Sequence, residues 1–481
     1  MHSSRPNLIF VFADQLRYSS CGFAGDYRAR TPAMDALSRQ GISFTQAVAS
    51  APVCTAYRAS LLTGKYTTST GMVINELRMN PHQRCLGHIL TEADYDTCYI
   101  GKWHLYANQL GHHDDPRNSH IPRGPHRLGF EGEWCAYNFH HENYGPLAYY
   151  HRESPEKIHY GDGVYEADAQ TGLAIDFLRR RAGESAPFAM VLSWGPPHDP
   201  WSTENTPTDL ASQFHPSDYP HPPNYKPVND PHGDAWSRLS EQERLELPVW
   251  RANYAAQVSS IDRNLGRLMA AIEEMGLAKD TLLVFTSDHG EMFGAHGRRA
   301  KNIFYEEACR VPLMMRWPNR IPAGLTSDAC IGTVDLLPTL AGLMGLETPS
   351  DVEGSDLSGL AYGGVEGTPD AAMMMICGAT ADWQDGHEWR ALRDSRHTYA
   401  TYRHDGAELL FDNADDPFQM RNQFANPAYD EVLSRFREQL RGKMSRIGDE
   451  FQACTWYRDH WTDGDRRIIR SATADWSVYA N

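Results

Sequence analysis

Short, continuously apolar runs alternate with amphipathic stretches over the first three quarters of the chain. The amphipathic stretches predict helices at 31–40 and 258–275, and the apolar runs predict buried strands at 8–13, 42–45, 95–100, 188–193, 282–286 and 311–316. Fully apolar strands separated by helices are typical of a parallel sheet covered on both faces, so we predict an α/β fold. Ligands of such sheets bind beyond the carboxyl ends of the strands, which makes the residues after each strand candidate site residues.

The pattern changes near residue 370. An amphipathic stretch at 429–444 predicts a helix, and short runs before it predict antiparallel strands at 373–377, 389–393, 398–403 and 408–411. We therefore expect two domains, an α/β catalytic domain over 1–370 and a smaller α+β domain over 371–481. The tail of the second domain carries Trp456, Trp461 and Trp476, which we expect to anchor it to the main domain. Segments 106–158 and 195–231 are predicted to be long surface excursions.

Composition narrows the class of protein. The 481 residues include 41% hydrophobic and 22% charged residues, the balance of a globular protein with a large core. A net charge of −17 argues against nucleic acid as a partner, because binding phosphates requires a cationic surface. No apolar run approaches the ~20 residues of a membrane span. Without a recognisable signal peptide we expect a cytoplasmic protein, or a periplasmic or secreted one if an export signal has been removed.

Two predicted strand ends carry side chains that can bind a metal ion. Asp14 and Gln15 follow the first strand, and Asp288 and His289 follow the strand at 282–286. Carboxylate, amide and imidazole groups together could surround a hard divalent cation. Each pair alone also fits a structural role, since an aspartate after a strand often caps a helix and a loop histidine can be structural.

The nine cysteines are far apart and form no Cys-x-x-Cys pair, so we expect buried free thiols, with Cys54 as the exception. Cys54 begins the string Cys-Thr-Ala-Tyr-Arg-Ala-Ser-Leu-Leu-Thr-Gly and precedes a helical stretch, where backbone N–H groups favour anions. Arg58, about one turn further on, can direct its guanidinium to the same place. This string resembles the signature of type I sulfatases, in which the cysteine is oxidised to formylglycine (3-oxoalanine). Ala56 stands where proline is commonest in that family.

Further segments resemble the same family in the same order. They are the strand end at Asp14, Gly101–His104 (Gly-Lys-Trp-His), Pro197–Pro200 (Pro-His-x-Pro), Thr286–Gly290, Lys301 and 408–422. Two positions depart from the commonest pattern: Gln15 stands where a second aspartate is frequent, and His289 stands where asparagine is frequent. The resemblance implies the alkaline-phosphatase-like sandwich, with a large, mostly parallel central sheet flanked by helices and a smaller C-terminal antiparallel sheet.

The resemblance also implies a role for each matching residue. Hydrated formylglycine at position 54 would attack the sulfur, and its second hydroxyl would later allow sulfate to leave. The catalytic set would be Cys54 itself, Arg58, Lys102 and Lys301 to neutralise the ester, His198 to protonate the leaving alcohol, and His104 as base. One divalent cation would be held by Asp14, Gln15, Cys54, Asp288 and His289; we expect calcium, with magnesium or manganese as alternatives. A formylglycine-generating maturing enzyme would be a required partner.

Several residues are candidates for contacts with the rest of the substrate. Arg298 and Arg299 could receive a second anionic group, and Tyr137, His140 and His296 could contact a sugar. The aromatic set that could stack on a sugar ring, or pack within its loop, is Tyr137, Phe139, Tyr144, Tyr149 and Tyr150. Residues 112–115 and 140–141 could form extra metal sites, although histidines in long loops often face solvent or substrate.

We therefore expect a sulfatase that hydrolyses an O-sulfate monoester of a mono- or short oligosaccharide. Lysine and arginine gather only near the expected site, and the two long excursions are expected to enclose it as a pocket. One alternative is a phosphonate monoester or phosphodiester hydrolase of the same superfamily, which tends to lack the Gly101–His104 element. The other is a non-catalytic binding protein, although no catalytic position is missing. The position of the ester and the oligomeric state are left open.

Overall fold

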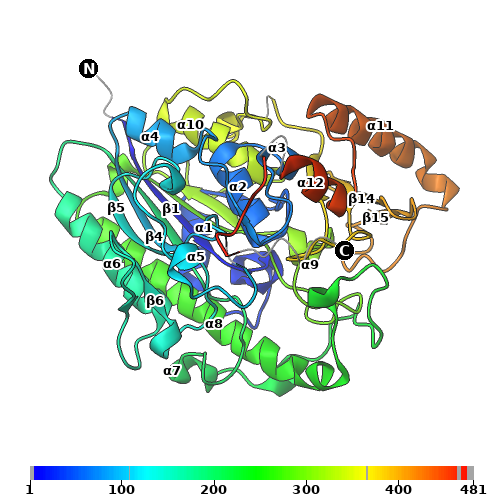
Figure 1. The fold of residues 1–481 in the computed structure, drawn as a ribbon, viewed down its shortest axis with the longest axis horizontal. Coiled ribbons are helices and arrows are strands. Elements are labelled where there is room, and N and C mark those ends of the chain that lie inside the picture. Colours follow the sequence, from blue (N-terminus) through cyan, green and yellow to red (C-terminus); the bar gives the residue numbers. More distant parts are fainter. Residues whose placement is uncertain (1–4, 108, 365–366, 463–466, 474–481) are drawn as a thin grey trace.

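A central eight-stranded sheet organises the computed structural model, which describes residues 5–107, 109–364, 367–462 and 467–473. Its strand order is β11-β2-β10-β9-β1-β8-β4-β5. The bounds are β1 Asn7–Ala13, β2 Ile42–Phe44, β4 Asp96–Lys102, β5 Glu133–Tyr137, β8 Phe188–Trp194, β9 Thr281–Ser287, β10 Leu313–Arg316 and β11 Leu325–Ser327. Figure 1 shows helices on both sides of this sheet, so the layered α/β fold expected from the apolar runs is confirmed.

Successive side chains of β1 point to opposite faces and enter two separate cores. Ile9 and Val11 pack in the core under α1 Pro32–Gln40, α6 Glu166–Arg181 and α8 Glu241–Glu274. The other core contains Leu8 and Phe10 and lies under α2 Cys54–Thr63, α4 Leu86–Glu92 and α10 Leu336–Met344. A strand buried on both faces must be apolar throughout, which is why β1 shows no alternation of polar and apolar residues.

Three details of the α/β domain differ from the prediction. β10 runs antiparallel to both β9 and β2, whereas β1, β8, β9, β4 and β5 pair in parallel. An antiparallel neighbour needs no crossover helix, and only the four-residue α9 Glu306–Cys309 lies between β9 and β10. β5 lies in the 106–158 segment that we expected to be irregular. The helix expected at 258–275 is the second half of α8, which starts at Glu241 behind a Ser240–Glu243 capping box.

The smaller sheet has the expected antiparallel order β12-β13-β14-β15. Its strands are β12 Ala372–Ile376, β13 Trp389–Arg393, β14 His397–Tyr402 and β15 Glu408–Asp412, and α11 Asp430–Arg446 covers one face. The opposite face packs on the start of α2 through Met374 and Trp389, in one core with Val53 and Ala56. This contact supports the helix turn that carries Cys54.

The C-terminal segment returns to the main domain. Tyr457 and Trp461 of α12 Cys454–Trp461 join the larger core, and β16 Ile469–Arg470 pairs with β3 Leu77–Arg78. Trp456 packs at the edge of that core, and Trp476 lies outside the described residues. The domain boundary at 370/371 stays a prediction. The remaining short α-helices and strands are α3 Thr67–Thr70, α5 Pro116–Ser119, α7 Thr208–Ala211, β6 Tyr149–Tyr150 and β7 Ile158–His159.

All nine cysteines are buried and none forms a disulfide, so the expectation of free thiols is confirmed for the structure. Among the described helices, none has both the length and the apolar character needed to cross a membrane.

Candidate active site

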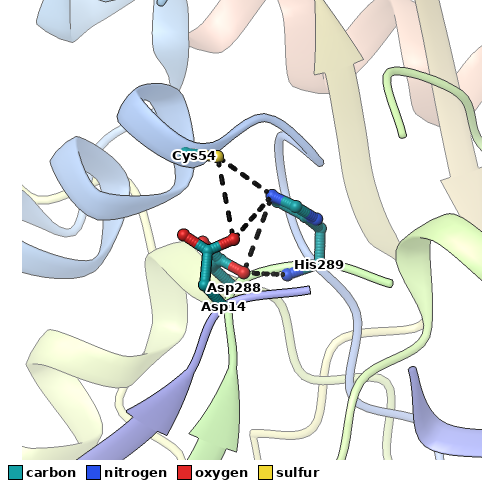
Figure 2. A group of neighbouring side chains, drawn as sticks. All are labelled: Asp14, Cys54, Asp288 and His289. Carbon is teal, nitrogen blue, oxygen red and sulfur yellow. Dashed lines mark hydrogen bonds and ion pairs between the residues drawn. The ribbon is translucent and has the colours of Figure 1, made fainter. Parts of the chain in front are cut away.

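Adjacent strands of the main sheet bring four segments to one edge. β9, β1, β8 and β4 lie side by side, and the residues at or just after their carboxyl ends include Asp288, Asp14, Ser193 and Lys102. The first turn of α2 meets this edge and carries Cys54. Figure 2 shows the Cys54 sulfur directed toward the Asp14 carboxylate and the His289 ring.

Asp14, Cys54, Asp288 and His289 form a compact buried cluster whose ligand atoms all lie within 4.8 Å of one another. Cys54 Sγ is 3.2 Å from His289 Nε2 and 3.9 Å from Asp14 Oδ1. His289 Nε2 is 3.6 Å from one oxygen of each aspartate. The two strand ends predicted to share a metal ion therefore do meet.

The cluster has the chemistry that a cation requires. His289 Nδ1 lies 3.1 Å from the carbonyl oxygen of Gly290, which can only accept, so the proton sits on Nδ1 and the Nε2 lone pair faces the carboxylates. Asp288 Oδ2 is buried without a hydrogen-bond donor among the described residues. Burial and the nearby Asp14 carboxylate raise the pKa of Asp288 to about 7. A bound cation would satisfy both carboxylates, so these residues fit a divalent metal.

Gln15 is placed differently from the other predicted ligands. Its side-chain amide nitrogen donates to Glu291 Oε2 at 2.5 Å, and its amide oxygen accepts from Lys301 Nζ at 3.0 Å. Its backbone N–H instead donates to Asp288 Oδ1 at 2.9 Å. In this structure Gln15 therefore links the metal-binding cluster to Lys301 and holds one carboxylate in position.

Two buried cations neutralise Asp14. Lys102 Nζ lies 2.6 Å from Asp14 Oδ2, and Arg58 lies 3.2 Å from the same oxygen. Burial alone would raise the pKa of Asp14, but Lys102 and Arg58 hold it well below its usual value. Arg58 is fixed by hydrogen bonds to the Lys102 carbonyl oxygen at 2.5 Å and to Ser193 Oγ at 2.9 Å. The site thus combines a carboxylate that stays ionised with two positive groups.

His198 and Lys301 form a hydrogen-bonded pair beside the cluster. His198 Nδ1 faces the carbonyl oxygen of Asp199 at 3.0 Å, so it carries the proton, and Nε2 accepts from Lys301 Nζ at 2.8 Å. Burial and Lys301 lower the pKa of His198 well below its usual value. Burial would lower the pKa of Lys301, but Cys54 and Asp14 raise it overall. At neutral pH the ammonium therefore holds the proton and the imidazole holds the lone pair.

His104 is buried just beyond β4, with a positive φ of 53° that turns the chain after Lys102. Its ring lies against Phe139, with ring centroids 4.5 Å apart. Burial and the positive charges of Lys102 and Arg58 lower the pKa of His104 well below its usual value, so the imidazole is neutral. A neutral imidazole can act as a base.

A cavity of about 590 Å³ opens onto this site. Cys54, His198 and Lys301 line it, together with Glu76, Leu110, His113, Asp114, Phe139, His140, His141, Glu142, Asp199, Trp201, Trp236, Trp250, Arg299 and other residues. Of the residues predicted to contact the rest of the substrate, Phe139, His140 and Arg299 line the cavity. Glu76 and the three tryptophans are additional lining residues that sequence reasoning missed, because no local pattern distinguishes them.

The other six predicted substrate contacts lie outside the cavity lining: Tyr137, Tyr144, Tyr149, Tyr150, His296 and Arg298. The Arg298 guanidinium is 3.0 Å from Asp230, and His296 stacks on Tyr305 with ring centroids 3.7 Å apart. Tyr137 lies beneath His140, at 3.6 Å between centroids, and its hydroxyl donates to a glutamate at 2.8 Å. Sequence proximity to Lys301 suggested Arg298 and His296, but several residues with positive φ redirect the chain between 293 and 302.

The alternative metal sites predicted in the loops are not formed as proposed. Across the part of the chain that the structure describes, the only other cluster of potential ligands joins His141 with His198 and Asp199. The Lys301 ammonium, 2.8 Å from His198, would repel a cation there. Residues 112–115 do not come together as a ligand cluster in this structure.

Comparison with known proteins identifies the relatives of this chain. A family model described as Sulfatase matches residues 6–346, and one described as N-sulphoglucosamine sulphohydrolase, C-terminal, matches residues 294–446. An ulvan-active sulfatase of Formosa agariphila is 33% identical over 94% of this chain and 84% of its own length. An N-acetylglucosamine-6-O-sulfatase of Bacteroides thetaiotaomicron is 27% identical over 88% of this chain and 82% of its own length. The solved structure of the sulfatase-like protein yidJ of Bacteroides fragilis superposes with a TM-score of 0.80 at 28% identity, covering 95% of this chain and 98% of that one.

Proposed function

This chain is a member of the sulfatase family, and we propose that it hydrolyses an O-sulfate monoester of a mono- or short oligosaccharide through formylglycine formed from Cys54. The observation that carries this proposal is the position of Cys54. It lines the cavity, begins a helix, and lies within 4 Å of a carboxylate and an imidazole that fit a metal ion. The names of two relatives, ulvan-active sulfatase and N-acetylglucosamine-6-O-sulfatase, support a carbohydrate substrate.

The buried cations would hold the sulfate group. A sulfate monoester carries one negative charge, and Arg58, Lys102 and Lys301 place three positive groups around Cys54. Asp14, Asp288 and His289 would hold one divalent cation, and we propose calcium because oxygen ligands predominate. The metal would supply Lewis-acid stabilisation of the charge that develops on the oxygens. Hydrated formylglycine would supply both the nucleophilic hydroxyl and the second hydroxyl that releases sulfate.

Lys301 and His198 are placed to move a proton to the departing alcohol. The proton resides on the Lys301 ammonium, which donates to the lone pair of His198 Nε2. Lys301 can pass this proton to the leaving oxygen directly, or to His198 Nε2, which then donates it to that oxygen; the hydrogen bond between them keeps both groups beside the same place. His104, neutral and buried beside Lys102, is proposed as the base that completes the cycle.

The size of the cavity favours a small substrate. A volume of about 590 Å³ lies in the range of pockets that enclose one small molecule. Phe139, Trp201 and Trp250 line it and offer flat apolar faces, which pack well against the faces of sugar rings. A long polymer would require a groove open at both ends, so we propose action on short or terminal units.

The test is sulfate release by protein co-expressed with a formylglycine-generating enzyme. Mass spectrometry of the peptide that contains residue 54 should show conversion of the thiol to an aldehyde. Monosulfated sugars and an aryl sulfate should then release sulfate, and a phosphonate monoester should be cleaved more slowly, as measured by release of its alcohol. The matched control is Cys54→Ser, which keeps a hydroxyl but cannot form the hydrate and should lose activity by orders of magnitude. A preference for the phosphonate, or near-full activity of the variant, would contradict the proposal.

A further inference from the structure

The charges that line the cavity are unevenly distributed. Apart from Lys301, the described lining residues include one arginine or lysine, Arg299. Four lining residues are acidic: Glu76, Asp114, Glu142 and Asp199. Beyond the groups that surround Cys54, the cavity is therefore richer in carboxylates than in cations.

Arg299 is already engaged by other protein groups. Its guanidinium forms an ion pair with Glu243, in the first turn of α8, and its Nε donates to the carbonyl oxygen of Trp236 at 3.2 Å. Neighbouring Arg298 is buried against Asp230 and does not line the cavity. A second sulfate or a carboxylate on the substrate would have to compete with Glu243 for the one remaining lining guanidinium.

Three of the four acidic lining residues lie against partners of their own. Asp114 accepts from Lys157 Nζ at 2.6 Å and from a tyrosine hydroxyl at 3.2 Å. Asp199 Oδ1 lies 3.1 Å from His198 Nδ1. Glu76 Oε1 lies 3.9 Å from His113 Nε2. Lys157 balances the charge of Asp114, which therefore repels an anion only weakly, but Asp114 and the other carboxylates can accept hydrogen bonds from hydroxyl groups.

His140 adds a neutral acceptor to the lining. Its Nε2 lies 3.1 Å from the carbonyl oxygen of Tyr149, so Nε2 carries the proton and Nδ1 is left with a lone pair. Nδ1 is buried and has no hydrogen-bond partner among the described residues. Burial lowers the pKa of His140 to about 3, so the ring is uncharged at neutral pH. A substrate hydroxyl can satisfy this atom, whereas an anionic oxygen cannot.

We propose that the sulfate ester is the only anionic group on the substrate, and that the sugar is otherwise an uncharged, hydroxyl-bearing ring. This inference rests on the proposed function and deepens it. A second sulfate or a carboxylate on the same ring would face Glu76 and Glu142, and the lining arginine, Arg299, is already paired with Glu243. The hydroxyls of a neutral ring would instead donate to these carboxylates and to His140.

The first experiment compares three substrates that differ in one group. They are a monosulfated hexoside that the enzyme cleaves, the corresponding sulfated uronate, and the methyl ester of that uronate. We expect kcat/KM for the uronate to be at least about tenfold below that for the hexoside, and the methyl ester to recover most of the loss, because it has the bulk but not the charge. Equal rates for the uronate and its methyl ester, or a preference for the uronate, would overturn the inference.

The second experiment releases Arg299. Glu243→Gln removes the negative partner of Arg299. The glutamine that it places at the third helical position still completes the capping box with Ser240. We expect the variant to raise the uronate-to-hexoside ratio of kcat/KM at least about threefold, since the freed guanidinium can accept the carboxylate. Glu92→Gln, which removes the same charge from an exposed pair with Arg84, is the matched control and should leave the ratio unchanged.

An aryl sulfate substrate distinguishes failure of this inference from failure of the proposed function. Sulfate release from the aryl sulfate together with indifference to the second charge would refute this inference and leave the proposed function standing. No release from any sulfate ester by protein with formylglycine at position 54 would refute the proposed function, and this inference with it. An unchanged ratio in Glu243→Gln would overturn the role assigned to the pair with Arg299.

Discussion

Glu166 offers the sharpest test of the electrostatics beneath the cavity. It is buried at the start of α6, where Oε1 accepts from the Tyr137 hydroxyl at 2.8 Å and from Gln170 at 2.9 Å. Burial raises the pKa of Glu166 from 4.5 to about 8. In the unfolded chain the carboxyl ionises near its ordinary pKa, so between these values the folded state holds one more proton. Stability contributed by Glu166 is therefore fully present below about pH 4.5 and is lost as the pH rises through 8.

The magnitude follows from the shift. A difference of 8 − 4.5 = 3.5 units corresponds to at most about 5 kcal/mol, of which about 3 kcal/mol falls between roughly pH 5.5 and 8.5. Glu166→Gln keeps an oxygen for both hydrogen bonds and cannot ionise, so this part of the pH dependence should disappear.

The assay is urea-induced unfolding of both proteins, followed by circular dichroism across that pH range. We expect the difference between the free energies of unfolding, Glu166→Gln minus the unsubstituted protein, to increase by about 3 kcal/mol from pH 5.5 to 8.5. Glu92→Gln, at an exposed ion pair, serves as control and should run parallel to the unsubstituted protein. Parallel curves for Glu166→Gln would refute the claim that the folded protein keeps this carboxyl protonated.

Three further substitutions test other parts of the site. Lys301→Met should reduce kcat about 10²–10⁴-fold on sugar sulfates, whose alcohols leave poorly, but much less on an aryl sulfate; an equal loss on both in steady-state kinetics would argue against proton donation. Asp14→Asn should lower the bound metal measured by mass spectrometry and reduce stability by about 3–5 kcal/mol, because it leaves buried cations unpaired; undiminished metal content would refute its assignment as a ligand. Gly101→Ala should strongly reduce folded yield and melting temperature, since Gly101 has φ 99° and a Cβ would lie 2.0 Å from the Ser193 carbonyl oxygen. Gly345→Ala, at φ 66° with open space around it, should cost only about 1–2 kcal/mol, and an equal loss at both positions would contradict the steric explanation.

The fold was predictable where burial dictates the residue pattern. The apolar runs at 8–13 and 188–193 correspond to β1 and β8, because strands covered on both faces leave no position for a polar side chain. The same pattern carries no information about strand direction, so the antiparallel β10 could not be distinguished from its parallel neighbours. β5 was missed because Glu133–Tyr137 is short and lies among histidine- and glycine-rich turns. Its position at the edge of the sheet depends on pairing with β4, which is a property of the tertiary structure.

The candidate site was also predictable from the sequence only in part. Asp14, Asp288 and His289 could be placed together from the sequence because they follow neighbouring strands, and the topology of a sheet brings such ends to one edge. The cavity wall follows no comparable rule, since Glu76, Trp201 and Trp250 come from three distant segments and meet only in the folded chain. Arg298 and Arg299 are adjacent in sequence but differ in position. Arg298 is buried against Asp230, whereas Arg299 lines the cavity beside Lys301. Asp14, Asp288 and His289 therefore lie at strand ends that a sequence pattern can reveal. The lining of the cavity depends on side-chain directions in loops and on which ion pairs they form, and only the structure shows these.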